Sequence, residues 1–378
     1  MAVSEGRKIS IRSGNTFGTR FKLEKVIVGM SGGVDSSVAA LLLKKQGYEV
    51  IGATYDFWHD DDAPEDIYRN LSDASEAKAV ADAIGIRHVA VNYTKQFRER
   101  VEKSFVSEYL NGRTPNPCVM CNPLVKWAAL CETADEYGAK YVATGHYARI
   151  DRLPNGRYAI KNSVTAKKDQ TYVLYGLSQV QLSRSLMPIG DYEKDEIRKI
   201  AAENALPVAS KPDSQEICFV SDNDYAAYID AHTDVTVKEG NFVDKNGNIL
   251  GRNKGITHYT IGQRRGLEIA AGHRIFVTDI RPETGEVVLG ENEELFTTEV
   301  LCSDLRFMSV SVLKEGEKLR VKAKIRYNHQ GEYGEIEALP DNKVICRFEK
   351  PVRAATPGQS MVFYDGDYVL GGGIICRF

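Results

Sequence analysis

Short apolar runs alternate with longer amphipathic segments through the first half of the chain. The apolar runs predict buried β-strands at residues 26–30, 48–54, 88–92 and 141–144. The amphipathic segments between them predict helices at 37–46, 72–84, 94–110 and 123–137. Repeated strand–helix units are typical of a doubly wound parallel sheet, which binds its ligands beyond the carboxyl ends of the strands.

The pattern changes after about residue 223. Glycine-punctuated segments replace the helices there, and the turn residues in 243–251 predict a hairpin. From about residue 294 the chain is predicted to be all β, and its clearest strand is 319–327. Odd positions of this strand are apolar, and the even positions place four cations on the other face: Arg320, Lys322, Lys324 and Arg326. Such a row is either a solvated strand face or a contact for a nucleic-acid backbone, and spacing alone does not choose between them.

The turn between the first strand and the first helix, residues 31–36, has the sequence SGGVDS. A strand, a glycine-rich turn and a helix N-terminus favour phosphate, because backbone N–H groups converge there and the helix dipole attracts negative charge. Gly32 and Gly33 allow a tight path, and the serine hydroxyls add donors. The chain has neither the lysine of a Walker loop nor a G-x-G-x-x-G dinucleotide motif. An ordinary Ser/Gly-rich turn is the alternative, but the order of residues resembles the PP-loop of ATP pyrophosphatases, which cut ATP between its α and β phosphates.

Charge and composition exclude several classes of protein. The net charge of the 378 residues is −3, so any surface for RNA must be a local patch of positive charge. No apolar run approaches the roughly 20 residues of a membrane span. Residues 1–24 lack the apolar core of a secretory signal, and we expect a flexible extension there in preference to a basic organellar presequence. Seven cysteines spread through a long chain favour a reducing, cytoplasmic setting over a secreted disulfide framework.

Three of the cysteines are candidates for chemistry. Cys118 and Cys121 lie in a proline-stiffened segment between two predicted helices, and Cys121 is placed near the start of the second, where a thiolate is favoured. Cys218 lies far downstream in a polar setting. Thiols can carry sulfur as a persulfide, attack an activated carbon or form a disulfide. The other four lie in apolar periodic segments and are predicted to be core residues: Cys131, Cys302, Cys346 and Cys376.

A nucleotide loop with two separated reactive thiols resembles the tRNA-specific 2-thiouridylases, and the resemblance covers nearly the whole chain. It rests on eight motifs in a fixed order, at 29–36, 112–117, 143–147, 168–170, 217–219, 260–264, 356–359 and 370–373. The family implies a doubly wound, parallel-sheet PP-loop domain, a small central domain and a C-terminal β-barrel that contacts tRNA. We therefore expect a flexible extension at 1–24, a catalytic ATP-binding domain at 25–223, a central domain at 224–293 and the barrel at 294–378.

The resemblance also implies a role for individual positions. ATP phosphates would be held by Gly29, Met30, Ser31, Gly32, Gly33, Val34, Asp35 and Ser36, with Tyr55 and Gly145 near the adenosine. Cys121 matches the family's nucleophile and Cys218 its persulfide carrier. The target base would face Asn116, Pro117 and Cys118, and the tRNA would contact His146, Lys168, Asp169, Gln170, Arg326, Tyr327 and Gln359. The implied cofactors and partners are ATP, Mg²⁺, a tRNA whose wobble uridine receives sulfur at C2, and a sulfur-donor or sulfur-relay protein.

Cys118 departs from the family pattern, which commonly has an aspartate there that can serve as an acid or base. The loop becomes Cys-x-x-Cys, and the resemblance permits a 4Fe–4S cluster on Cys118, Cys121 and Cys218, because related sulfur-inserting PP-loop enzymes use such an arrangement. A simple redox pair and an incidental extra cysteine are the alternatives, and a structural zinc would need a fourth ligand. We prefer the persulfide route to the cluster.

Two other functions remain open at this level. One is an ATP-dependent ligase or amidotransferase that acts on a small molecule, as other PP-loop proteins do. The other is a nucleotide-binding regulator that never turns ATP over. Sulfur incorporation into tRNA in the presence of ATP distinguishes the thiouridylase from both.

Overall fold

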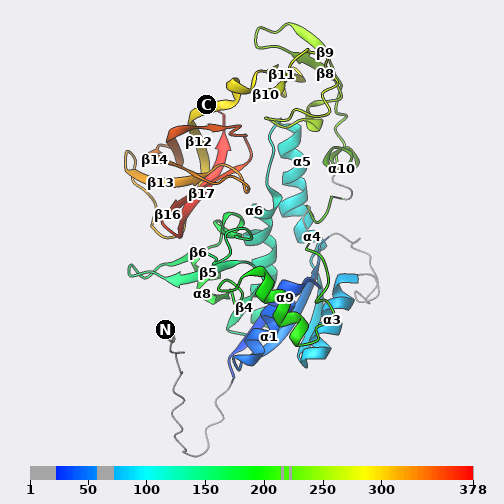
Figure 1. Cartoon of the computed structure of the whole chain (residues 1–378), viewed down its shortest axis with the longest axis vertical. Helices are drawn as coiled ribbons and strands as arrows, with labels where there is room; N and C mark the ends of the chain where they lie inside the picture. Colours follow the sequence, from blue (N-terminus) through cyan, green and yellow to red (C-terminus); the bar gives the residue numbers. More distant parts are fainter. Residues whose placement is uncertain (1–22, 58–71, 214–216, 221–223, 378) are drawn as a thin grey trace, which may run out of the picture.

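The computed structural model describes residues 23–57, 72–213, 217–220 and 224–377. The extension expected at 1–24 therefore lies almost wholly outside the described residues. Three sheets organise the rest, one parallel and two largely antiparallel. Figure 1 shows them as separate bodies, with the long helix around α5 running up from the parallel sheet toward the central one. We call the parts around these sheets the PP-loop domain, the central domain and the barrel.

The PP-loop domain has a five-stranded parallel sheet in the order β3-β2-β1-β4-β7. Its strands are β1 (Lys25–Gly29), β2 (Glu49–Asp56), β3 (Arg87–Asn92), β4 (Tyr141–Ala143) and β7 (Ser185–Leu186). The chain builds outward from β1 through β2 to β3 and then returns to place β4 on the other side of β1. Strand order therefore reverses between β1 and β4, which is where open α/β sheets bind ligands.

Helices cover both faces of this sheet because successive β1 residues point to opposite sides. Val26 and Val28 pack into the core formed with α1 (Val34–Lys45) and α9 (Lys194–Glu203), whereas Ile27 packs into the core formed with α7 (Trp127–Glu136). The other helical segments that the structure describes up to residue 231 are α3 (Ser72–Ile84), α4 (Thr94–Phe97), η1 (Arg98–Glu102), α5 (Lys103–Leu110), α6 (Pro117–Cys121), η2 (Asn122–Lys126), η3 (Thr171–Leu174), α8 (Gln179–Arg184) and α10 (Tyr225–Ala231). The predicted doubly wound sheet is confirmed.

Two of the predicted helices start earlier than expected. The first begins at Val34 with Gly33 as its N-cap, so that the end of the SGGVDS motif lies inside the helix. The other begins at Pro117 rather than at residue 123, because Asn116 caps it and proline fits its first position. Cys118 and Cys121 consequently lie within a helix and not in a loop before one.

A hairpin from the PP-loop domain extends the sheet of the barrel. It consists of β5 (Ala148–Arg152) and β6 (Tyr158–Asn162), and β6 pairs with the last barrel strand at Lys161 and Tyr368. In Figure 1 the hairpin lies directly beneath the barrel. The two parts are therefore joined by backbone pairing as well as by side chains.

The central domain has four strands in the order β10-β11-β8-β9. They are β8 (Gly240–Val243), β9 (Ile249–Asn253), β10 (Phe276–Arg281) and β11 (Glu286–Gly290), with short 3₁₀ segments η5 (Ile256–His258) and η6 (Asn292–Leu295). The hairpin predicted at 243–251 is present, since β8 and β9 pair antiparallel across a turn closed by Asp244. A separate core around Phe242, Tyr259 and Leu289 holds this sheet together.

The C-terminal part is a closed antiparallel barrel of six strands. They are β12 (Phe296–Phe307), β13 (Lys318–Lys324), β14 (Glu332–Leu339), β15 (Lys343–Arg353), β16 (Ser360–Asp365) and β17 (Tyr368–Cys376), and β12 closes the barrel by pairing with both β15 and β17. Val321 and Ala323 point into the core as the alternation predicts, although the strand ends at Lys324 instead of 327.

Of the four cysteines predicted to be core residues, Cys302 and Cys346 are fully buried, while Cys131 and Cys376 are half-buried. Within the described part of the chain, no helix has the length and apolar character needed to span a membrane.

Candidate active site

The SGGVDS turn connects β1 to α1 at the switch point of the sheet. Gly32 has φ +67°, and a Cβ there would lie 2.9 Å from the backbone oxygen of Asp73, so this position requires glycine. Gly33 is extended, and a Cβ there would meet only the Ser31 hydroxyl at 3.4 Å. The hydroxyls of Ser36 and Ser37 donate to the Gly33 carbonyl oxygen at 3.2 and 2.8 Å. The turn is therefore shaped by its own hydroxyls and leaves the first amides of α1 without helical partners.

The two residues expected near the adenosine lie in different surroundings. Gly145 follows β4 and packs against the turn so closely that a Cβ would be 2.5 Å from the backbone nitrogen of Ser36. Tyr55 lies at the carboxyl end of β2 and donates its hydroxyl to Thr133 at 2.9 Å, across the core. Burial raises the pKa of Tyr55, so the phenol stays neutral. Gly145 therefore sits against the phosphate-binding turn, whereas the Tyr55 hydroxyl is engaged by α7.

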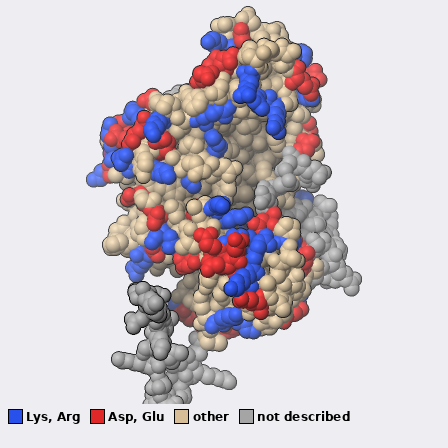
Figure 2. All heavy atoms as spheres, in the orientation of Figure 1, with Lys and Arg blue, Asp and Glu red and all other residues tan. Residues whose placement is uncertain are grey.

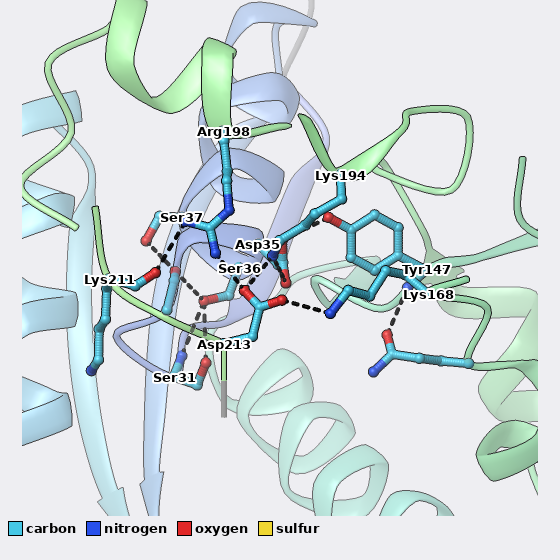
Figure 3. Close-up of polar contacts among 12 residues, drawn as sticks. Ser31, Asp35, Ser36, Ser37, Tyr147, Lys168, Lys194, Arg198, Lys211 and Asp213 are labelled. Carbon is cyan, nitrogen blue, oxygen red and sulfur yellow. Dashed lines mark hydrogen bonds and ion pairs between the residues drawn. The ribbon is translucent and has the colours of Figure 1, made fainter. Parts of the chain in front are cut away.

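Asp35 is held by two side chains from distant parts of the chain. Lys194 donates to its two carboxylate oxygens at 2.7 and 2.9 Å, and the Tyr147 hydroxyl donates at 2.7 Å. Figure 3 shows Lys194 and the Tyr147 ring next to each other, both directed toward Asp35, and the Lys194 Nζ lies 5.7 Å from the centre of that ring. Asp35 is thus already paired and positioned in the free protein.

A second carboxylate, Asp213, lies among three cations beside the same turn. Lys168, Lys194 and Arg198 approach it at 2.8, 2.8 and 2.9 Å, and Figure 3 shows them converging on it. Partial burial alone would raise its pKa, but hydrogen bonds from Lys168 and Lys194 lower the pKa of Asp213 to about 2. The turn is therefore bordered by several positive charges that phosphate groups can use.

The sequence analysis assigned no role to four members of this network: Tyr147, Lys194, Arg198 and Asp213. Lys194 and Asp35 are 159 residues apart, and nothing local links them. Spacing does place Lys194 and Arg198 on one face of α9, four residues apart, but any solvated helix gives that pattern. Only the packing of α9 against α1 directs them to the turn.

The candidate thiols lie on a helix with an unusual turn. The side chain of Asn116 accepts the backbone N–H of Cys118 at 3.1 Å and so caps α6. Pro123 then interrupts the regular hydrogen-bond ladder because it has no N–H, and the helix widens into a π-turn over Asn122–Lys126. In a wider turn, a residue five positions on returns close to the same face. Lys126 thereby shares the side of the helix that carries Cys121.

Cys121 does not have the environment that the sequence suggested. Its side chain is 5% exposed, and it is the fifth residue of α6 rather than one of the first. Burial raises the pKa of Cys121 to about 12, although Lys126 partly offsets this. The expectation that the helix N-terminus would favour a thiolate at Cys121 is wrong, because burial outweighs the dipole there.

Cys218 lies close enough to this helix to share its electrostatics. The residue is exposed, yet desolvation by the surrounding protein raises the pKa of Cys218, and Lys126 acts in the opposite direction. Cys118 is half-buried and interacts electrostatically with both of the other thiols. Three thiols and one lysine therefore occupy a single neighbourhood, and the sequence analysis missed the lysine.

These thiols do not form a ready metal site. Over residues 23–57, 72–213, 217–220 and 224–377, no group of three or more His, Cys, Asp or Glu side chains is placed to hold a metal ion. The donor set required for a 4Fe–4S cluster on Cys118, Cys121 and Cys218 is therefore not assembled in this arrangement, and we derive no step through such a cluster.

The candidate tRNA contacts in the PP-loop domain are engaged within the chain. The His146 ring bonds the Thr144 hydroxyl at 2.9 Å and packs against Trp127. Burial, helped by Lys126, lowers the pKa of His146 to about 3, so the imidazole is neutral at physiological pH and cannot serve as a cation for phosphate. Gln170 accepts the backbone N–H of Tyr147 at 2.9 Å, and the Asp169 carboxylate accepts backbone N–H groups of neighbouring residues.

The candidate contacts in the barrel face the PP-loop domain. The Tyr327 hydroxyl donates to the backbone oxygen of Asp169 at 3.2 Å. Arg326 donates to the Arg353 carbonyl at 2.8 Å, and the Gln359 amide donates to the Thr114 carbonyl at 2.8 Å. Residues that the sequence places in separate domains therefore meet near the thiol helix.

Charge on the molecular surface is mixed rather than segregated. Figure 2 shows basic and acidic side chains interspersed over this face, which is hollowed between the central domain and the PP-loop domain. This agrees with the net charge of −3 and with the expectation that an RNA surface would be local.

Comparison with known proteins extends these observations to the whole chain. Residues 24–222 match the tRNA methyl transferase HUP domain, 228–291 the tRNA methyl transferase PRC-barrel domain and 297–375 the aminomethyltransferase beta-barrel domain. The tRNA-specific 2-thiouridylase MnmA of Lachnoclostridium phytofermentans is 53% identical over 360 residues, covering 94% of this chain and 100% of that protein. The protein of the same name from Clostridioides difficile is 51% identical over 358 residues, covering 94% and 99%.

The chain belongs to the tRNA-specific 2-thiouridylase family. Its three-part architecture, with a parallel-sheet domain, a central domain and a C-terminal barrel, is that of the family. Membership of this PP-loop family implies that the chain binds ATP, and the SGGVDS turn at the switch point fits a polyphosphate. The family resemblance expected from the eight motifs is confirmed.

Proposed function

We propose that this protein is an ATP-dependent sulfurtransferase that converts the C2 carbonyl of a tRNA wobble uridine to a thiocarbonyl. The observation that carries the proposal is the full-length identity of 50% or more to proteins named tRNA-specific 2-thiouridylases. The turn around Gly32 and the shared neighbourhood of Cys121 and Cys218 support it, because the reaction needs both a phosphate site and two thiols. We also propose domain boundaries at 25–223, 224–293 and 294–378.

The first step activates a poor leaving group. The C2 oxygen of uridine attacks the α-phosphorus of ATP, an AMP–oxygen bond forms, and pyrophosphate leaves into the turn at 31–36. The amides of α1 and the cations Lys168, Lys194 and Arg198 balance the phosphate charge. Mg²⁺ bound together with the nucleotide would shield phosphate charge, and the Asp35 carboxylate of the turn is the residue that could help to hold it.

The second step transfers sulfur. The terminal sulfur of a persulfide on Cys218 attacks C2 of the adenylated uridine, and the carbon–oxygen bond to AMP breaks. Cys121 then attacks the Cys218 sulfur, so that the persulfide S–S bond breaks, sulfur remains on the uridine and a Cys121–Cys218 disulfide forms. An external dithiol reductant supplies two electrons to restore the thiols. Because burial raises the pKa of Cys121 to about 12, it reacts only if Lys126 or substrate binding stabilises its thiolate.

Mass spectrometry of tRNA nucleosides tests the proposal. Purified protein, ATP, unmodified tRNA and a persulfide donor should yield 2-thiouridine, and omission of ATP should abolish it. Cys218→Ser and Cys121→Ser should each lose product while retaining tRNA binding, and Cys376→Ser, a half-buried barrel cysteine, serves as the matched control. ATP turnover on a small molecule without RNA thiolation would favour a ligase or amidotransferase, and nucleotide binding without turnover would favour a regulator.

A further inference from the structure

One short connection in the PP-loop domain contacts both of the other domains. Residues 111–116 join α5 to α6, and every polar group of Thr114 in this connection is bonded outside its own domain. Its N–H donates to the Pro357 carbonyl at 2.9 Å and its carbonyl accepts the Gln359 amide at 2.8 Å, both in the barrel. Its hydroxyl lies 3.2 Å from the hydroxyl of Thr260 in the central domain.

Two glycines at this junction lie too close to neighbouring residues to carry a side chain without strain. Gly358 has φ +92°, and a Cβ there would lie 2.9 Å from the Thr114 nitrogen. Gly112 has φ +63°, and a Cβ there would lie 3.0 Å from the Ile280 side chain of the central domain. Two glycines in two different motifs therefore permit the barrel and the central domain to press on the same connection.

Two tyrosine side chains lie beside Thr260, and the hydroxyl of one of them, Tyr225, donates to the nearby His258 carbonyl at 3.2 Å. Tyr109, near the end of α5, and Tyr225, at the start of α10, stack with their ring centres 5.0 Å apart. Burial raises the pKa of both phenols, and hydrogen bonding to Thr260 partly offsets the rise in each case. The Thr260 hydroxyl thus lies within a small cluster of hydroxyls in which Thr114 takes part.

The connection leads directly to the thiols. Thr114 lies two residues before Asn116, whose side chain caps α6 through the N–H of Cys118. Five residues of α6 precede the π-turn, and α7 continues the helix beyond it, so the place of Cys118 and Cys121 depends on how the N-terminus is held as well as on the packing of α7. A shift of Thr114 would move Asn116, and with it Cys118 and Cys121.

We propose that the hydroxyl contact between Thr114 and Thr260 positions the thiol helix for sulfur transfer, so that Thr260 is a positioning residue supplied by the central domain. The inference rests on the proposed function. It also gives the motifs at 260–264 and 356–359 the same structural role, because each contacts the connection 111–116 from a different domain.

Substitution of the two threonines tests the proposal. Thr260→Val keeps the shape and removes the hydroxyl, and we expect the single-turnover rate of sulfur transfer to fall about five- to tenfold, as for the loss of one hydrogen bond, with tRNA affinity unchanged within about twofold. Thr260→Ser keeps the hydroxyl and should retain the wild-type rate. Thr114→Val should also lower the rate, although less than Thr260→Val, because Thr260 interacts with Tyr109 and Tyr225 as well. The double variant should be no slower than Thr260→Val alone. Tyr368→Phe removes another bond across domains, to Asp151 in the β5–β6 hairpin, and should leave the rate unchanged.

A second measurement uses the free protein and needs no sulfur transfer. A loosened helix exposes Cys121, so Thr260→Val should increase the rate of its alkylation by iodoacetamide several-fold, whereas Thr260→Ser should not. Equal rates for Val and Ser variants, additive effects in the double variant or a loss of tRNA affinity equal to the loss of rate would overturn the positioning role. If the wild-type protein thiolates no tRNA while the alkylation difference persists, the proposed function fails and the positioning role stands.

Discussion

The thiols of this protein differ in reactivity because their surroundings differ. Cys121 is buried, and its pKa is raised to about 12, whereas Cys218 is exposed. We predict that iodoacetamide at pH 7.5 alkylates Cys218 at least about tenfold faster than Cys121, because both access and thiolate fraction favour Cys218. Peptide mass mapping after timed quenching measures the order. Faster labelling of Cys121 would mean that the helix opens more readily than its packing suggests.

The lowered pKa of His146 makes the free energy of unfolding depend on pH. Its pKa is about 3 in the folded protein against an ordinary value of 6.5, so the unfolded chain binds the extra proton between those values. The stability that the neutral ring contributes is complete above pH 6.5 and is lost as pH falls toward 3. We predict that His146→Gln reduces the fall in unfolding free energy between pH 7.5 and 5.5 by about 1 kcal/mol. Urea denaturation of both proteins at the two pH values measures it, and an identical fall in both would show that His146 is protonated in the fold.

At the scale of elements, the periodic segments could be predicted and the long-range pairings could not. The strands around Ile27 and Val142 and the helix at 72–84 follow from local hydrophobic period. The helix start at Pro117 was missed because prolines and asparagine in 115–117 also suit a loop, and the cap becomes visible only in three dimensions. Nothing in the local sequence of the β5–β6 hairpin predicts that it will pair with a barrel strand more than 200 residues away.

Some residues of the candidate site could likewise be predicted from the sequence, and others could not. The SGGVDS turn and the thiols Cys121 and Cys218 could be found in the sequence, because their residue types and order are specific. Lys194 could not, since its approach to Asp35 depends on α9 packing across α1. The thiolate expected at Cys121 was wrong for a related reason, because burial is a property of the whole fold.

Lys194 of helix α9 forms ion pairs with both carboxylates beside the turn, Asp35 and Asp213. The Lys194 side chain is 12% exposed and bonds Asp35 and Asp213, so its removal leaves two carboxylates short of a partner. We predict that Lys194→Met weakens ATP binding at least tenfold, measured by calorimetry. Lys199→Met on the same helix is the matched control, because that side chain is 75% exposed and should leave ATP affinity unchanged. Equal behaviour of the two variants would remove Lys194 from the nucleotide site.

On the scale of the whole molecule, the barrel and the PP-loop domain present their candidate RNA contacts toward each other. Tyr327 donates to the Asp169 backbone oxygen, and Lys324 interacts electrostatically with Asp169, so the end of β13 and the turn after it face the PP-loop domain. Arg320, farther back on the same strand, is paired with Glu349 at 2.8 Å. A basic row that looks uniform in sequence is therefore divided by the fold into a paired end and an end that faces the site.

That division gives a prediction about tRNA binding. Among the described residues, Arg326 makes a single hydrogen bond, to the Arg353 carbonyl, which leaves other guanidinium N–H groups for phosphate. Arg326→Met should therefore weaken tRNA binding and reduce the slope of log affinity against log salt by about one. Arg320→Met, within β13 itself, is the control, and the Glu349 pair should make it nearly neutral. Filter binding of unmodified tRNA over a series of salt concentrations measures both slopes. An unchanged slope for Arg326→Met would show that the turn after β13 does not contact phosphate. An equal loss from both variants would mean that the whole row contacts RNA and that the Glu349 pair breaks on binding.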